Sequence, residues 1–164
     1  MIKQIIPEGH CLKCKGCCRF KEADSAWVPT LLAEEALELI DKDLPPVAIS
    51  KGKKLMAVPS PEEGSFICPF LKLQGNACAV YSTRPFECQL YPFLIAFRHT
   101  KIILTVDLNC PWVQENMSGR EFKEYTGYLS AHLNTPAVLY MLKDNPQVLQ
   151  AYEQVSEIVE LGPT

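Results

Sequence analysis

The feature that most constrains this chain is a run of four cysteines near its start, in the stretch Cys-Leu-Lys-Cys-Lys-Gly-Cys-Cys at residues 11–18. The chain has eight cysteines among its 164 residues. Thiolate sulfur is a soft ligand, which suits zinc and iron–sulfur clusters and does not suit magnesium or calcium. The cysteines therefore predict a metal centre, and all eight are candidate ligands: Cys11, Cys14, Cys17, Cys18, Cys68, Cys78, Cys88 and Cys110.

The composition narrows the class of protein. Hydrophobic residues make up 48% of the chain and the net charge is −3 at pH 7, which is ordinary for a globular protein in water. A nucleic-acid-binding protein usually carries a strongly basic face, so no nucleic-acid partner is expected. The longest apolar runs, 93–97 and 102–106, are far shorter than the roughly 20 residues of a membrane-spanning helix, so no membrane segment is expected either.

The first residues of the chain indicate the cellular compartment in which we expect the protein. They contain no apolar signal-peptide region and no small-residue cleavage site, so we expect a cytoplasmic protein. The cytosol keeps thiols reduced, which favours metal ligands over disulfides. An even number of cysteines also suits disulfide bridges, and that alternative remains open at this point.

The spacing of the first cysteines favours an iron–sulfur centre over zinc. Zinc sites usually take cysteines in Cys-x2-Cys pairs, two pairs to a tetrahedron. Here residues 11–17 form a Cys-x2-Cys-x2-Cys triple, the run by which bacterial ferredoxins place thiolates on one cluster. In that pattern a Cys-Pro dipeptide supplies another ligand, and this chain has two, Cys68-Pro69 and Cys110-Pro111. We expect one or two [4Fe-4S] clusters, with Zn²⁺ as the alternative.

The adjacent pair Cys17 and Cys18 suggests how the ligands divide. Neighbouring side chains leave the backbone in different directions, so the two sulfurs do not easily bind the same ion. One hypothesis has two centres, with Cys18 facing away from the first: Cys11, Cys14 and Cys17 hold one, and Cys68, Cys78 and Cys88 clamp the other. The alternative is that one or two of the later four cysteines are simply buried apolar residues.

Arg84 is a candidate cofactor-binding residue, because it lies between Cys78 and Cys88 in the sequence. A guanidinium group offers several hydrogen-bond donors in a fixed plane. It can therefore donate to thiolate, to inorganic sulfur or to a substrate anion.

The first half of the chain predicts few regular elements. Residues 30–42 read as a helix capped by Thr30, with Leu44-Pro45-Pro46 stopping it. Short strands are predicted at 53–58 and 65–67. The stretch 68–92 reads as an irregular loop, and aromatic and β-branched residues at 93–97 and 101–107 predict an antiparallel hairpin that turns at His99-Thr100.

The last third predicts helices. Ser118 and Glu121 form a capping-box pattern that opens a helix running to about residue 133. Thr135-Pro136 opens a second helix at 137–143, and Asn145-Pro146 starts a third, with one apolar face: Val148, Leu149, Tyr152, Val155 and Val159. We therefore expect an α+β fold, in which a small irregular cysteine-rich core with a short hairpin packs with several helices. Residues 1–164 are expected to form one domain, with the metal-binding core at 11–111 and a helical part at 118–161.

These residues resemble the CxxCxxCC cysteine-cluster family, which is described as a zinc- or iron-chelating domain. The likeness covers about residues 11–111 and runs through the cysteine run, Cys68-Pro-Phe-Leu, and Cys78-Ala-Val-Tyr-Ser-Thr-Arg84-Pro85-x2-Cys88-x2-Tyr91-Pro92-Phe93. The resemblance implies metal or iron–sulfur binding by the cysteines. A similar module accompanies S-adenosylmethionine chemistry in flagellin lysine N-methylases.

The chain departs from that family pattern at three positions. Lys15 stands where a glycine often follows the second cysteine, Gln89 stands where an arginine is common, and Trp112 follows Cys110-Pro111 in place of a glycine-rich turn. The last two departures weigh against a basic substrate-binding role.

Three functions fit the sequence. The first is an iron–sulfur protein with a redox or cluster-dependent role. The second is a small protein-modifying enzyme, methyltransferase-like, although the chain has no G-x-G nucleotide fingerprint. The third is a zinc-stabilised interaction module that binds a protein partner through its C-terminal helices. Whether the chain is an enzyme is left open.

Overall fold

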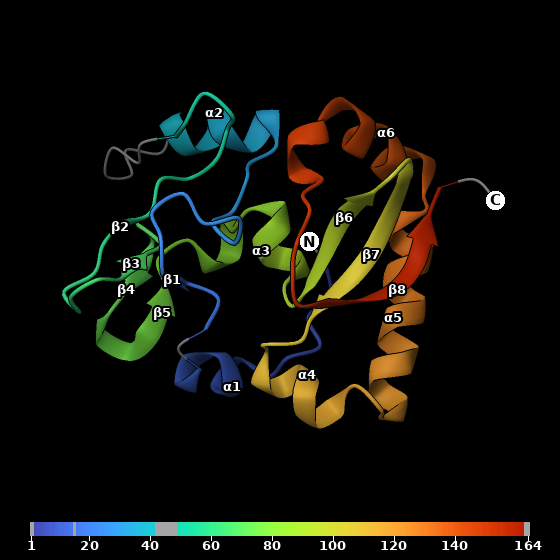
Figure 1. The fold of residues 1–164 in the computed structure, drawn as a ribbon, viewed down its shortest axis with the longest axis horizontal. Coiled ribbons are helices and arrows are strands. Elements are labelled where there is room, and N and C mark those ends of the chain that lie inside the picture. The colour runs from blue at the N-terminus through green and yellow to red at the C-terminus, as the bar shows by residue number, and fades with distance from the viewer. Residues whose placement is uncertain (1, 15, 42–48, 163–164) are drawn as a thin grey trace. The chain divides into compact units, whose positions relative to one another are not determined.

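The computed structural model describes residues 2–14, 16–41 and 49–162 of the chain (Figure 1). Contacts divide the chain into two compact units. Residues 7–89, here called the cysteine unit, form one of them. Residues 1–6 and 90–164, here called the sheet unit, form the other.

The sheet unit is built on an antiparallel sheet with the strand order β6-β7-β8. Strands β6 (Phe93–Arg98) and β7 (Lys101–Asp107) form the hairpin that the sequence predicts, and Phe93 pairs with Val106. His99 in the turn takes a positive φ of 56°, which a tight reversal between two strands requires. The predicted hairpin and its turn are therefore confirmed.

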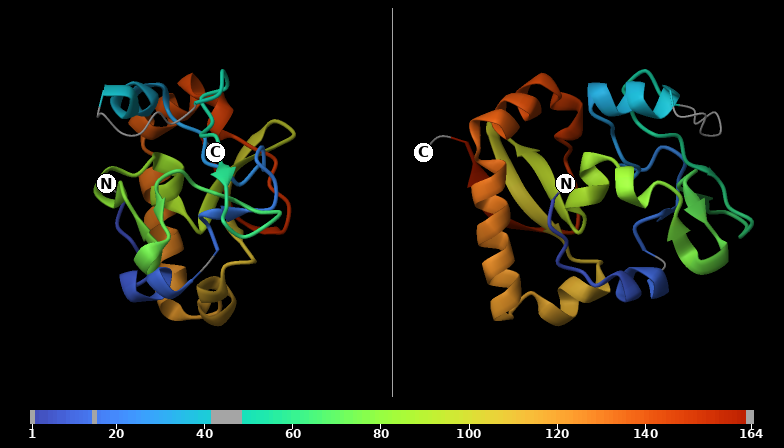
Figure 2. Two further views of the ribbon diagram at one scale, coloured as in Figure 1. Left: turned by 90° about the vertical axis from the view of Figure 1, so that its left-hand side faces the viewer. Right: turned by 180° about the vertical axis from the view of Figure 1, so that it is seen from behind.

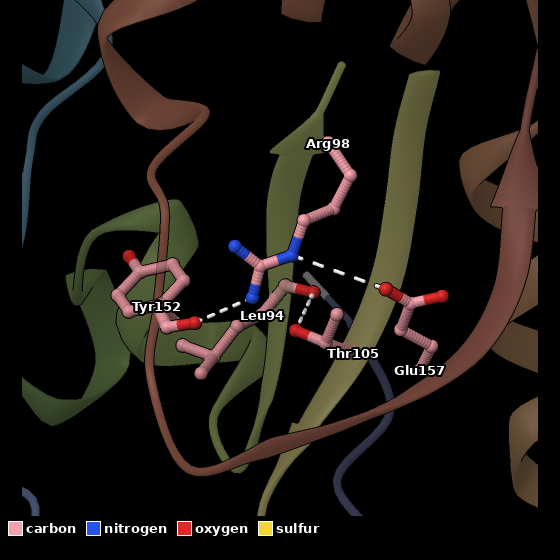
Figure 3. A network of polar contacts seen from close by, with 5 residues as sticks. All are labelled: Leu94, Arg98, Thr105, Tyr152 and Glu157. Atoms are coloured by element: carbon pink, nitrogen blue, oxygen red, sulfur yellow. Dashed lines mark hydrogen bonds and ion pairs between the residues drawn. The ribbon is translucent and has the colours of Figure 1, made fainter. Parts of the chain in front are cut away.

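The prediction of a third helix, starting at Asn145-Pro146, is wrong. Only a 3-10 turn, Pro146–Val148, forms where that helix was expected to begin, and residues Val155–Leu161 form strand β8 on the free edge of β7. The sequence between them is tied to the sheet, because Arg98 donates to the Tyr152 carbonyl at 2.6 Å and lies 3.9 Å from the Glu157 carboxylate (Figure 3). β-branched residues favour strands when an edge is available, and this tertiary contact overrides the apparent helical period.

Three helices complete the sheet unit: α4 (Pro111–Asn116), α5 (Arg120–Leu133) and α6 (Pro136–Asp144). Helix α5 packs beside β8, as Figures 1 and 2 show. The ring centroid of Phe93 lies 5.4 Å from those of both Phe122 and Tyr125, so α5 and the sheet share an aromatic core. The second predicted helix is confirmed within a residue at each end, and α4 was not predicted.

The predicted helix caps need correction. The N-cap of helix α5 is Gly119, one residue after the predicted Ser118, and it has no side-chain cap bond. Thr135 does occupy the N-cap of α6, but its hydroxyl donates to the His132 carbonyl at 2.9 Å and leaves the helix start uncapped. The positions of α5 and α6 are predictable from the apolar pattern and, for α6, from the proline at N1. Whether a side chain caps the helix depends on local geometry, which the sequence pattern does not give.

The cysteine unit is irregular, as predicted. Its elements are α1 (Glu8–Lys13), β1 (Arg19–Phe20), α2 (Ala33–Asp41), β2 (Val58–Pro59), β3 (Phe66–Ile67), β4 (Leu71–Lys72), a 3-10 turn η1 (Gln74–Asn76), β5 (Ala77–Cys78), a second 3-10 turn η2 (Tyr81–Thr83) and α3 (Phe86–Leu90). The strands pair as β1-β3-β2 and β4-β5. Two-residue strands have little stability alone, so the unit depends on its buried side chains and on polar contacts.

Several predictions for this half of the chain were only partly right. Helix α2 is confirmed, but it begins at Ala33, three residues after the predicted cap Thr30, which forms an isolated backbone bridge with Lys54. The predicted strand at 53–58 is mostly wrong: Lys54 and Leu55 form only isolated bridges, and β2 begins at Val58 and pairs with β3. The predicted loop at 68–92 contains β4, β5 and α3. The predicted stop at Leu44-Pro45-Pro46 lies outside the described residues.

Two carboxylates join α2 to α3. Glu35 accepts hydrogen bonds from the backbone N–H of Leu32 at 2.9 Å and from that of Phe86 at 2.6 Å, so one side chain satisfies the first turn of both helices. A second contact runs from α3 to the segment before α2: Glu87 on α3 accepts a hydrogen bond from the N–H of Thr30 at 2.8 Å. Burial raises the pKa of Glu35, although the two backbone bonds oppose the shift. These contacts fix α3, the helix that carries Cys88.

The secondary structure makes this an α+β protein, as expected. In the described part of the chain, no helix is long and apolar enough to cross a membrane.

Replacing Glu35 by alanine should lower the free energy of unfolding by about 2 kcal/mol, because two half-buried N–H groups lose their acceptor. Glu34→Ala is the matched control: it removes an exposed carboxylate from the same helical turn and should cost less than about 1 kcal/mol. Urea unfolding followed by circular dichroism measures both. Equal losses in the two variants would show that helix-dipole electrostatics, and not the α2–α3 contact, accounts for the effect.

Candidate metal centre

Strand pairing brings the first cysteine run to the second group of cysteines. Strand β1, which directly follows Cys18, pairs with β3, which directly precedes Cys68. The Cys68 N–H donates to the Cys18 carbonyl at 3.0 Å and so continues the ladder. Two residues far apart in the sequence are thereby fixed side by side.

Cys78 joins them through the next hairpin. It lies on β5, where it pairs with Leu71 of β4, and the Leu71 N–H donates to the Cys68 carbonyl at 3.0 Å. Cys68 belongs to the buried core of this unit, and Cys18 and Cys78 pack against that core. The apolar core residues are Phe20, Val28, Leu31, Leu39, Leu55, Phe70 and Val80.

Cys88 completes this group from α3. Burial raises the pKa of the Cys88 thiol well above its ordinary value, and charges at Cys68, Cys18 and Cys78 raise it further. Burial also raises the pKa of Cys68 to about 12, with smaller contributions from Cys18 and Cys78. Burial is the main cause of both shifts, and the smaller charge contributions link Cys88 with Cys18, Cys68 and Cys78. Together with the strand pairing, they place four thiols from separate segments in one region of the unit. Cys18, Cys68, Cys78 and Cys88 are called the inner set below.

The other three cysteines of the N-terminal run are more accessible. Cys11 lies on α1 and Cys17 directly precedes Cys18, and both are exposed, while Cys14 is half-buried. A Cβ atom at Gly16 would come within 3.3 Å of the Cys14 sulfur, so a glycine here leaves room for that sulfur. Cys11, Cys14 and Cys17 are called the outer set.

The two sets meet at the Cys17–Cys18 step. The two sulfurs are 4.0 Å apart and share a hydrogen bond. This bond raises the pKa of Cys17 and lowers that of Cys18 to about 7, and Arg19 and Arg84 add to the lowering at Cys18. One thiol of the pair is therefore readily ionised near neutral pH.

The charge of Arg84 acts on two of these sulfurs, those of Cys18 and Cys78, and its role as a cofactor-binding residue remains a prediction. Its guanidinium stacks on the Tyr81 ring, 4.4 Å from the ring centroid. Its positive charge lowers the pKa of Cys18 and counters the effect of burial on Cys78. The Arg84 Nε is buried, and among the described residues it finds no hydrogen-bond acceptor. A buried N–H of this kind is costly without a partner and suits a sulfide or thiolate acceptor.

Cys110 is the one cysteine of the described residues that belongs to the sheet unit. It is buried at the N-cap of α4. Its assignment as a ligand remains a prediction.

The chemistry of the donor set fits a soft metal centre. All eight cysteines are free thiols, so the disulfide alternative has no support. Within the residues that the structure describes, no three His, Cys, Asp or Glu side chains converge closely enough to hold an ion. The four sulfurs of the inner set share one region of the unit. To bind one metal ion or cluster, they would have to move closer to one another.

Sequence reasoning missed the polar residues that support the cysteines. Glu35 lies in the predicted helix at 30–42, and Glu87 and Asn76 lie in the predicted loop at 68–92, with no role assigned to any of the three. For Asn76 a signal was present, because Gly75-Asn76 precedes Cys78 by two residues and favours positive φ.

The chain belongs to the CxxCxxCC family, described as "Putative zinc- or iron-chelating domain", whose family model matches residues 10–119. The predicted resemblance is therefore confirmed, and with it the coarse expectation of a metal-binding cysteine protein. The match spans the whole of the inner and outer sets. No curated protein and no solved structure matches the chain.

In metal-free, reduced protein, alkylation should label Cys11 much faster than Cys68. Cys11 is exposed, whereas Cys68 is 7% exposed and its pKa is raised to about 12, and alkylation requires an accessible thiolate. Mass spectrometry of peptides after timed iodoacetamide treatment measures both rates in one sample. Unfolding in guanidinium is the control, because it should equalise them. Equal rates in the folded protein would contradict the described burial.

Proposed function

We propose that this chain is a cysteine-ligated metalloprotein that holds an iron–sulfur centre, with Zn²⁺ as the alternative. The observation that carries the proposal is the inner set, in which four thiols from separate segments gather beside one arginine. Four thiolates are the usual ligand set of a [4Fe-4S] cluster and also of a structural zinc ion. Membership of a zinc- or iron-chelating family supports the same conclusion.

Arg84 favours iron–sulfur over zinc within this proposal. Its buried Nε–H has no acceptor among the described residues, and a cluster presents inorganic sulfide in addition to the cysteine sulfurs. Hydrogen bonds to these sulfurs and the positive charge raise the reduction potential of a cluster. Arg84 would therefore bind and tune the centre, which when bound would supply electron transfer or cluster-dependent chemistry.

We infer that the two sets hold two separate centres. Cys18 influences the pKa of Cys68, Cys78 and Cys88, so it belongs with the inner set. Cys11, in contrast, acts on Cys17 alone among the shifted thiols. The charge of Cys88 also contributes to the pKa of Cys17, and the Cys17 sulfur contacts that of Cys18. These contacts support a boundary between the two proposed centres at Cys17 and Cys18.

A redox role in the cytoplasm would require a protein that supplies or accepts electrons. Helices α5 and α6 expose Tyr128 and Tyr140, which are 37% and 66% accessible. Tyrosine is enriched at protein interfaces, so these helices are the proposed partner face.

Metal and sulfide analysis of anaerobically purified protein tests this function. About four irons and four sulfides per chain would establish one cluster, and about eight of each would establish two. Zinc without sulfide would replace the iron–sulfur proposal by the zinc alternative. Protein that takes up neither metal under reducing conditions would falsify the proposed function.

The variants Cys68→Ser and Cys14→Ser test the division into two centres. Each removes one ligand from a different set, so each should lose about half of the metal while retaining the remainder. The double variant should lose all of it. If either single variant lost all metal while its circular dichroism stayed native, the two sets would belong to one shared centre.

Removing the metal should also lower the melting temperature. A ligand present at 1,000 times its Kd stabilises the native state by about 4 kcal/mol, which corresponds to about 10 °C for a chain of this size. Calorimetry before and after chelation measures the shift, and adding the metal back is the control. An unchanged melting temperature would show that the centre does not support the fold.

A further inference from the structure

Helix α1 has almost nothing of its own to hold it in place. It has six residues, Glu8–Lys13, and none of them is buried. A helix of this length is not stable in water by itself, and it lacks the apolar face by which short helices usually attach to a core. Yet it carries Cys11, and Cys14 forms its C-cap. Some other contact must therefore fix these two thiols.

The Asn76 carboxamide makes that contact. Its Nδ2 donates to the Leu12 carbonyl at 3.0 Å, to the Cys11 carbonyl at 3.4 Å and, at short range, to the Cys14 carbonyl. The last carbonyls of a helix have no partner within the helix. One side-chain nitrogen thus donates to three backbone carbonyls at the C-terminal end of α1.

Asn76 is itself fixed on both sides. Its Oδ1 accepts from the Arg19 guanidinium at 2.7 Å, and Arg19 lies on β1, directly after Cys18. Its backbone takes a positive φ of 52°, and η1 leads directly into β5 and Cys78. Asparagine tolerates this left-handed conformation better than most residues. The side chain therefore connects both ends of the N-terminal cysteine run to the hairpin that carries Cys78.

We propose that Asn76 is a positioning residue for the metal centre, whose amide nitrogen holds the Cys11–Cys14 segment where its thiols can bind metal. This inference rests on the proposed metal-binding function. The residue does not touch the metal: it acts on the backbone of two ligands, as outer-shell partners do in other metal sites.

Two substitutions distinguish the contribution of the Asn76 amide nitrogen from that of the rest of the residue. Asn76→Asp keeps the shape of the side chain and an oxygen for Arg19, but it replaces the N–H donors by an oxygen that the three carbonyls repel. Asn76→Gly removes the side chain and keeps positive φ accessible. Gln74→Glu is the matched control, because it makes the same amide-to-carboxylate change at an exposed position of the same turn.

The readout is the protection of single cysteines from alkylation during titration of reduced, metal-free protein with Zn²⁺. The midpoint for Cys14 should rise about 10- to 100-fold in both Asn76 variants, the usual cost of losing an outer-shell partner. The midpoint for Cys68, measured in the same sample, should not change, which also shows that the unit remains folded. In Gln74→Glu the Cys14 midpoint should stay within about twofold of wild type.

The outcomes distinguish this inference from the proposed function. An unchanged Cys14 midpoint in both Asn76 variants overturns the positioning role and leaves metal binding intact. Equal rises for Cys14 and Cys68 also overturn it, because they show a disturbance of the whole unit. If Zn²⁺ protects no cysteine of the wild-type protein, metal binding fails, and the positioning role fails with it.

Discussion

Crowding of sulfur is the constraint on which the cysteine unit depends. Thiolates held close together repel one another, and burial makes each charge more costly. The chain without metal can tolerate the crowding only by keeping thiols protonated, as the raised pKa values of Cys68 and Cys88 show. A cation or cluster removes both costs at once. The proposed centre would relieve this cost, and the charge of Arg84 would contribute part of the positive charge.

Polar contacts, more than regular secondary structure, hold the ligands. The strands of the cysteine unit are two residues long, and the helix with Cys11 buries nothing. Three side chains compensate: Glu35 and Glu87 fix the helix that carries Cys88, and Asn76 fixes the segment that carries Cys11. Glu35 and Asn76 satisfy backbone groups at helix ends, which short elements leave unpaired, and Glu87 accepts from the N–H of Thr30 in the segment before α2.

Regular elements could be predicted from the sequence, whereas the polar contacts that hold the ligands could not. The hairpin at 93–107 and helices α2 and α5 have long apolar patterns, which made them predictable. The cysteine run and Arg84 were found because their chemistry is visible in the residue types. Strand β8 was misread as a helix, because only the free edge of β7 decides its conformation. Asn76, Glu35 and Glu87 were missed, because their partners are backbone atoms far away in the sequence.

The contact between the Cys18 carbonyl and the Cys68 N–H also has a consequence for synthesis. The ribosome releases the first four cysteines well before Cys68, Cys78 and Cys88 exist. Contacts between distant parts of a chain form slowly, so the nascent protein passes through a period in which its early thiols are exposed and incompletely coordinated. The proposed inner centre needs Cys88, so its assembly would follow synthesis of more than half the chain.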